Sequence, residues 1–185
     1  MLSGLLYWLS PRRRRFMRRL GRPALARLEA RLATAGSPAA IAFCSILLLA
    51  NAEFLAFAIS SPDGALARFA ASATPAQAEA CLAAMLIYSA SLFARDEMRR
   101  DDTQLIPLLA HVSGLEVTQV MLRRDQLRKA PRSEEWQLYT WLCAALGGER
   151  PAYDAQLERA FSYGYLSYIS QYRPALERAL ARLES

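Results

Sequence analysis

The stretch Ala39–Ile59, AAIAFCSILLLANAEFLAFAI, runs for 21 residues, and its only charged side chain is Glu53. At about 1.5 Å of rise per residue, a helix of this length matches the hydrocarbon core of a bilayer. A helix that is apolar on all sides also occurs at the centre of a soluble helical bundle. The fold therefore depends on whether lipid or protein surrounds this run.

A second apolar run, Ala78–Ala94, contains Glu79 as its only charged residue and has a more amphipathic pattern. The connection between the runs, residues 60–76, holds only Asp63 and Arg68, whereas arginines cluster before the first run and after the second. Short loops rich in arginine stay on the cytoplasmic side of a membrane. The pattern predicts a two-span membrane hairpin, in a bacterial or mitochondrial inner membrane, with both termini on the cytoplasmic or matrix side.

Two polar residues of the first run, Asn51 and Glu53, oppose this interpretation. A carboxylate near the centre of a bilayer costs about 2.5–3.5 kcal/mol on insertion scales. Both side chains are therefore expected to make interhelical polar contacts. The alternative is a cytoplasmic protein in which the same hairpin is buried by amphipathic helices.

The positive charge of the chain is concentrated at its N-terminus. Residues 1–35 hold nine arginines and one acid, Glu29, which gives this segment a charge of +8. The whole chain has a net charge of +6, so the other 150 residues carry a charge of −2. Such a basic arm is expected to seek an anionic surface.

The first ten residues, MLSGLLYWLS, place an apolar and aromatic segment directly before the arginines. This order predicts an interfacial anchor, with Leu5, Leu6 and Trp8 in the lipid interface and the arginines at the headgroups or on a partner. A mitochondrial presequence and a helix docked on protein are the alternatives. The arginines predicted to make these contacts are Arg12, Arg13, Arg14, Arg15, Arg18 and Arg19.

The rest of the chain predicts helices only, since Ala, Leu and Arg dominate and no strand-like alternation occurs. The predicted class is all-α, with a basic amphipathic arm (1–35), an apolar helical hairpin (36–102) and a C-terminal helical bundle (103–185). In the last of these, Phe161, Tyr165, Tyr168 and Tyr172 fall on one helix face, which predicts packing within the bundle, with a surface for a partner as the alternative. The predicted helices cover residues 23–35, 39–59, 65–75, 76–100, 103–129, 134–146, 151–172 and 174–184.

No pattern in the sequence indicates catalysis. The single histidine, His111, has no acid or cysteine three or four residues away, and Glu116 lies at the wrong distance for a di-iron helix motif. The three cysteines lack zinc or redox spacing, and no phosphate-binding glycine loop is present. We therefore expect no enzyme activity, no cofactor and no metal site.

These observations predict a non-catalytic membrane-associated accessory or scaffolding subunit. Its partners would be protein subunits of a larger complex and anionic lipid headgroups. Nucleic acid is disfavoured, because the body of the chain supplies no second basic patch. The alternative is a soluble all-α binding module, such as a regulator, an adaptor or a toxin-neutralising partner, that uses the basic arm on an acidic protein or nucleic acid.

Overall fold

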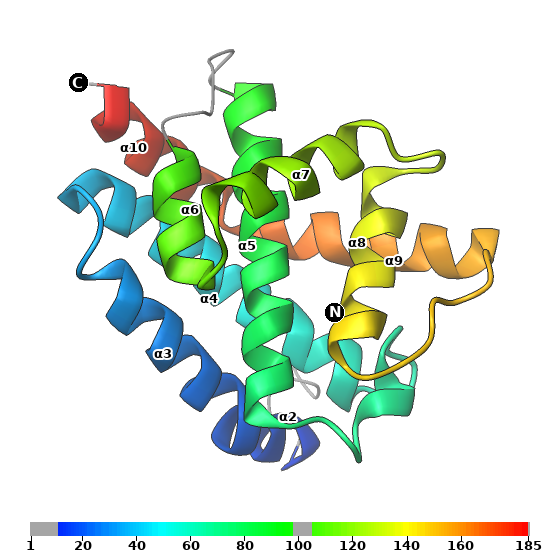
Figure 1. Ribbon diagram of the computed structural model, residues 1–185. Coiled ribbons are helices and arrows are strands. Elements are labelled where there is room, and N and C mark those ends of the chain that lie inside the picture. The colour runs from blue at the N-terminus through cyan, green and yellow to red at the C-terminus, as the bar shows by residue number, and fades with distance from the viewer. Residues whose placement is uncertain (1–10, 98–104, 185) are drawn as a thin grey trace.

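The long apolar run forms helix α4 (Pro38–Ser60), which lies at the centre of the molecule (Figure 1). The Ser37 hydroxyl caps its first turn by accepting a hydrogen bond from the Ala40 N–H, and Pro38 occupies the first helical position. All side chains from Asn51 to Leu55 are buried, so this part of α4 contacts protein on every side.

The computed structural model describes residues 11–97 and 105–184, with side chains over 11–93 and 105–183. Over these residues it contains helices and no strand, so the predicted all-α class is confirmed. The remaining helices are α2 (Pro11–Phe16), the π-helical turn η1 (Met17–Gly21), α3 (Arg22–Leu32), the short 3₁₀-helix η2 (Ala67–Phe69), α5 (Pro75–Glu97), α6 (Ile106–Ser113), α7 (Val117–Arg128), α8 (Glu134–Ala145), α9 (Ala155–Gln171) and α10 (Arg173–Glu184).

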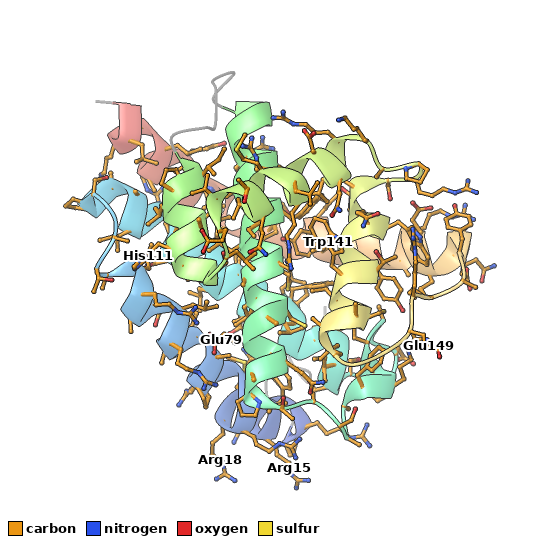
Figure 2. All side chains as sticks on the ribbon, in the orientation of Figure 1. Arg15, Arg18, Glu79, His111, Trp141 and Glu149 are labelled. Carbon is orange, nitrogen blue, oxygen red and sulfur yellow. The ribbon has the colours of Figure 1, made fainter. Side chains whose placement is uncertain are left out.

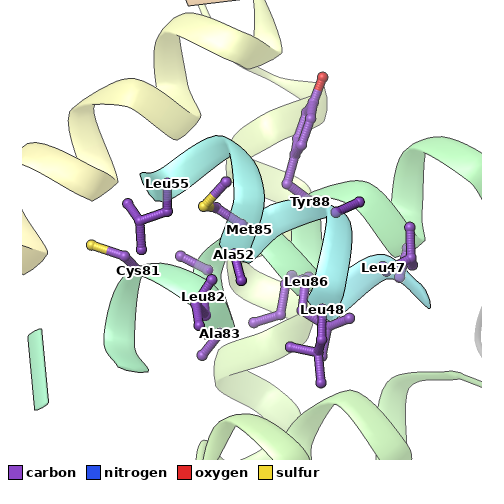
Figure 3. Close-up of a cluster of buried hydrophobic side chains, with 14 of the residues drawn as sticks. Leu47, Leu48, Ala52, Leu55, Cys81, Leu82, Ala83, Met85, Leu86 and Tyr88 are labelled. Carbon is purple, nitrogen blue, oxygen red and sulfur yellow. The ribbon is translucent and has the colours of Figure 1, made fainter. Parts of the chain in front are cut away.

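Helices α4 and α5 form the predicted hairpin and cross at the middle of the fold. The chain leaves α4 through Gly64, where a Cβ atom would lie 2.4 Å from the Ala58 carbonyl oxygen, so only glycine fits. The same carbonyl accepts a hydrogen bond of 2.8 Å from the Leu66 N–H, which fixes the turn. Figure 3 shows the contact between the two helices. Its labelled side chains are Leu47, Leu48, Ala52, Leu55, Cys81, Leu82, Ala83, Met85, Leu86 and Tyr88.

The other helices enclose this hairpin. Helices α3, α9 and α10 pack against α4, while α3, α6, α7 and α8 pack against α5. Both α4 and α5 are long and apolar enough to cross a membrane, and about two thirds of the most apolar window of each is buried inside the protein. One continuous hydrophobic cluster includes residues from all three predicted segments of the chain.

The prediction of one helix over residues 103–129 is wrong, because the chain forms α6 and α7 instead. Gly114 ends α6 with a φ of 69°, a left-handed conformation that glycine adopts without strain. A capping box then starts α7, in which Glu116 and Gln119 each bond to the backbone of the other. A single helix would place Leu122 on one apolar stripe with Leu108 and Leu115, but on α7 it is 58% exposed.

The aromatic stripe of α9 packs against α4 as predicted. Phe161 and Tyr165 are buried, and their ring centroids lie 5.4 Å and 5.0 Å from that of Phe54 in edge-on arrangements. Tyr168, which is half-buried, approaches the same ring to 5.7 Å. Phe54 is therefore the aromatic centre of the α4–α9 interface.

The three cysteines provide a test of whether the hairpin is enclosed by the other helices. Cys44, Cys81 and Cys143 are free thiols with no exposed surface. We expect a thiol reagent to label none of them rapidly in the native protein and all three in denaturant, because labelling requires an opening of the core. Rapid native labelling of Cys44 or Cys81, followed by mass spectrometry of peptides, would contradict the enclosed hairpin.

Candidate functional site

The arginine-rich segment forms one continuous helix from Pro11 to Leu32, made of α2, η1 and α3. Its buried side chains recur at every fourth position. In an α-helix such a row drifts around the axis, but the wider π turn η1 in the middle offsets the drift. The buried row therefore stays against the hairpin along the whole segment. Its members are Phe16, Leu20, Ala24, Leu28 and Leu32.

The opposite side of this helix carries exposed arginines, and Figure 2 shows Arg15 and Arg18 pointing away from the body. Five of the six arginines predicted as lipid or partner contacts are exposed. Arg22, which the sequence prediction did not single out as a contact residue, lies on the same exposed side. We call this set the arginine surface: Arg12, Arg14, Arg15, Arg18, Arg19 and Arg22.

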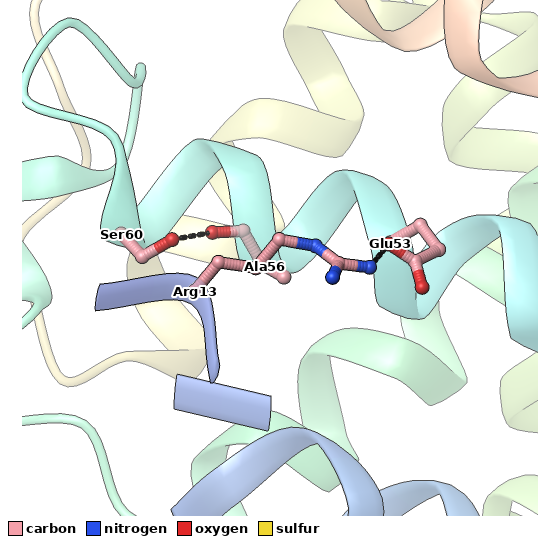
Figure 4. A network of polar contacts seen from close by, with 4 residues as sticks. All are labelled: Arg13, Glu53, Ala56 and Ser60. Atoms are coloured by element: carbon pink, nitrogen blue, oxygen red, sulfur yellow. Dashed lines mark hydrogen bonds and ion pairs between the residues drawn. The ribbon is translucent and has the colours of Figure 1, made fainter. Parts of the chain in front are cut away.

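Arg13 is different, because its guanidinium forms an ion pair with Glu53 of α4 (Figure 4). The two side chains are only 12% and 11% exposed. Glu53 is thus an interhelical contact between α4 and α2. Arg13 contributes to the attachment of α2 rather than to the exposed surface.

The other carboxylate of the hairpin, Glu79 of α5, is bound in the same way. It forms ion pairs with Arg27, at 2.9 Å, and with Arg31, both from α3. The single acidic residue in each apolar run is therefore neutralised by an arginine of the N-terminal helices. No local signal in the sequence indicated these pairings, since the partners are 40 or more residues apart.

Asn51 makes the second predicted interhelical contact. Its Nδ2 donates to the Ser89 Oγ of α5 at 3.1 Å, and its Oδ1 accepts from the Tyr165 hydroxyl of α9 at 2.8 Å. All three residues are fully buried. A buried amide with both ends hydrogen-bonded avoids the cost of an unsatisfied polar group.

The arginine surface borders a cavity of about 550 Å³, which we call the arginine cavity. The Arg13–Glu53 ion pair lies in its lining, so the cavity reaches from the surface to the hairpin. Among the described residues, five arginines and one carboxylate line it, which leaves a large excess of positive charge. The lining consists of Pro11, Arg13, Arg14, Arg15, Met17, Arg18, Arg22 and Glu53.

The remaining predicted site residues, Leu5, Leu6 and Trp8, lie outside the described residues. His111 is exposed, and its Nε2 lies 3.1 Å from the Thr34 hydroxyl. Within the described part of the chain, no group of three His, Cys, Asp or Glu side chains could hold a metal ion.

A second polar cluster joins the start of α8 to α9. Glu158 accepts hydrogen bonds from the Ser133 hydroxyl and N–H and, at 2.7 Å, from the Tyr153 hydroxyl. These bonds, the Ser133 hydroxyl first, hold the pKa of Glu158 below its ordinary value. Because these hydrogen bonds favour the ionised carboxylate, Glu158 is expected to stabilise the fold at neutral pH.

This contribution is expected to disappear in acid. A carboxyl whose pKa is depressed by folding stabilises the protein above its unfolded pKa, about 4.3, and loses that effect as the pH falls through its folded pKa. Glu158→Gln should therefore be less stable than wild type at pH 7 and approach it below about pH 4. Urea unfolding at both pH values measures the difference, and a difference that does not change with pH would contradict this role.

Comparison with protein-family models, curated proteins and solved structures finds no match for the chain.

Proposed function

We propose that the protein is a non-catalytic, membrane-associated accessory or scaffolding protein that binds anionic lipid through its arginine surface. The observation that supports this proposal is the arginine surface itself. It places six exposed arginines on one continuous helix whose other side is anchored in the core. Because the helix is held in place, its charges are presented together to a partner surface.

The charge is sufficient for binding to a membrane. A basic side chain near an anionic leaflet contributes about 1 kcal/mol, so six give about 6 kcal/mol at low salt. Binding of this kind weakens with ionic strength, because salt screens exposed charges. The preceding Leu5, Leu6 and Trp8 would add apolar contacts with the lipid interface.

In this proposal the hairpin remains in the protein core. Membrane insertion of α4 and α5 would require the surrounding helices to leave about two thirds of their most apolar windows. It would also separate Glu53 and Glu79 from the arginines that neutralise them. Attachment through the surface keeps every one of these contacts.

The enclosed hairpin also favours a second candidate function, a soluble helical binding module. In that case the same arginine surface would bind an acidic protein. Binding to polyglutamate, without binding to anionic vesicles, would favour this second candidate. For either function, partner proteins would bind to the outer surface of the helices that enclose the hairpin.

Vesicle binding tests the proposal. The arm variant carries Arg12→Gln, Arg15→Gln, Arg18→Gln and Arg19→Gln. The control variant removes the same charge from exposed positions elsewhere. Its substitutions are Arg128→Gln, Arg150→Gln, Arg159→Gln and Arg178→Gln.

On phosphatidylcholine vesicles that contain phosphatidylglycerol, we expect the arm variant to bind about 1,000-fold more weakly than wild type. The control variant should stay within about tenfold of wild type, because only long-range attraction changes. Equal losses for both variants in a co-sedimentation assay would show that net charge, and not the arginine surface, controls binding.

A further inference from the structure

The exposed arginines are unevenly distributed, and four of them surround the arginine cavity. Arg14, Arg18 and Arg22 recur at every fourth position, and the π turn η1 keeps them in one row. Arg15 lines the cavity beside this row. Arg12 and Arg19 do not line it and instead border a neighbouring cavity of about 150 Å³, to which Arg15 also contributes.

The four cavity arginines have no acidic partner among the residues that the structure describes. Arg14, Arg15, Arg18 and Arg22 form no ion pair with any of them, in contrast to Arg13, Arg27 and Arg31 of the same helix. The one carboxylate among the described lining residues, that of Glu53, already binds Arg13. Like charges held this close repel one another, so an anion in the cavity would be stabilised.

The chemistry of the lining identifies the kind of anion. A guanidinium presents its N–H donors in a planar fork that matches the oxygens of a phosphate group. Several forks around one space suit a phosphate, which offers oxygens in several directions. The volume of about 550 Å³ lies within the range of ligand sites and exceeds the need of a bare inorganic ion.

We propose that the arginine cavity is a binding site for a phosphate group, carried by a lipid headgroup or by a free phosphate-bearing molecule. A lipid headgroup as the source of the phosphate rests on the proposed function. The inference adds a defined binding pocket to the general attraction between the arginine surface and the membrane. Arg14, Arg18 and Arg22 contact the bound phosphate, and the outward-pointing side chains of Arg15 and Arg18 turn in over it (Figure 2).

Glu53 gives this site an unusual property. Its carboxylate pairs with Arg13 in the lining of the cavity and is the one negative charge among the described lining residues. Glu53→Gln removes that charge and so raises the net positive charge that meets the ligand. The variant should therefore bind phosphate several-fold more tightly than wild type, even though it is less stable. A variant that merely disturbs the fold would bind more weakly.

The experiment compares two pairs of substitutions from the same helix. The cavity variant is Arg14→Gln/Arg18→Gln, and the matched variant is Arg12→Gln/Arg19→Gln. Each pair removes two exposed charges, and thermal unfolding checks that both variants fold, since Arg19 also donates to the Ala73 carbonyl at 3.2 Å. Calorimetry with pyrophosphate measures the site without lipid, and vesicles of phosphatidylcholine with phosphatidylglycerol measure it with lipid.

With pyrophosphate, we expect the cavity variant to bind at least about tenfold more weakly than the matched variant, the effect of about 1.4 kcal/mol of lost contacts. With vesicles, the affinity of both variants should fall about 30-fold, because each loses two surface charges. The affinity of the cavity variant should fall at least a further tenfold. Equal losses in both assays would overturn the cavity while leaving the surface attraction intact. Cavity-dependent pyrophosphate binding without vesicle binding would support the site, assign it to a soluble phosphate compound and overturn the membrane proposal.

Discussion

Phe54→Ala is expected to lower the free energy of unfolding by about 3–5 kcal/mol, the cost of deleting a fully buried aromatic side chain. Phe54 is 1% exposed and contacts the rings of Phe161, Tyr165 and Tyr168. The truncation removes the aromatic contacts between α4 and α9 at the point where the two helices pack. In a chain of this size the melting temperature should fall by about 6–20 °C. Urea and thermal unfolding followed by circular dichroism measure both effects.

The control for this variant is Leu122→Ala, which truncates a side chain that is 58% exposed on α7. Its effect should stay within about 0.5 kcal/mol. If Phe54→Ala cost no more than Leu122→Ala, α9 would not pack on α4, and the enclosed hairpin would be wrong.

Arg13→Gln is expected to cost about 3 kcal/mol. The substitution leaves the carboxylate of Glu53, whose side chain is 11% exposed, without its guanidinium partner. Removal of one member of a buried ion pair costs about 3–5 kcal/mol, and the slight exposure of this pair places it at the lower end of that range. Denaturant unfolding at neutral pH measures the change.

The double variant Arg13→Gln/Glu53→Gln distinguishes the ion pair from simple packing. It removes both charges and retains two side chains that can bond to each other, so it should be more stable than Arg13→Gln alone. A double variant whose loss equals the sum of the two single losses would show that Arg13 and Glu53 do not interact.

The long helices were predictable because their signals are local. Ser37-Pro38 begins α4, and the serines, proline and glycine of residues 60–64 end it, within one residue of the predicted range. The aromatic stripe of α9 was predictable because helical spacing puts its members on one face. The break at Gly114 was not, because a glycine inside a helical pattern either continues the helix or ends it, and tertiary packing decides which.

The ion pairs of Glu53 and Glu79 could not be predicted from the sequence. Glu53 and Glu79 stand out as acids in apolar runs, but their partners Arg13, Arg27 and Arg31 are three among nine N-terminal arginines. Nothing local distinguishes an arginine that turns inward from one that remains exposed. The fold makes the distinction, because only the side of the helix that faces the hairpin meets its carboxylates.

The environment of α4 could not be read from its composition either. Its side chains are apolar on almost every side of the helix, so its composition does not distinguish a lipid environment from a protein environment. The amphipathic helices that enclose it lie far away in the sequence, in α3, α9 and α10. Glu53 and Asn51 indicated only that protein must contact that part of the helix, and the contacts with α2, α5 and α9 are of this kind.

Salt extraction tests most directly whether the protein binds membranes through its arginine surface while the hairpin stays enclosed. Wild-type protein is bound at low salt to phosphatidylcholine vesicles that contain phosphatidylglycerol, and the pelleted vesicles are then washed with about 1 M salt, where the Debye length falls to about 3 Å. We expect the protein to be released, because the exposed arginines supply most of the attraction and the few apolar contacts of Leu5, Leu6 and Trp8 are too weak to hold it alone. Protein that stays in the vesicle pellet after this wash, and that detergent alone releases, would show that α4 and α5 have entered the bilayer and would contradict the enclosed hairpin.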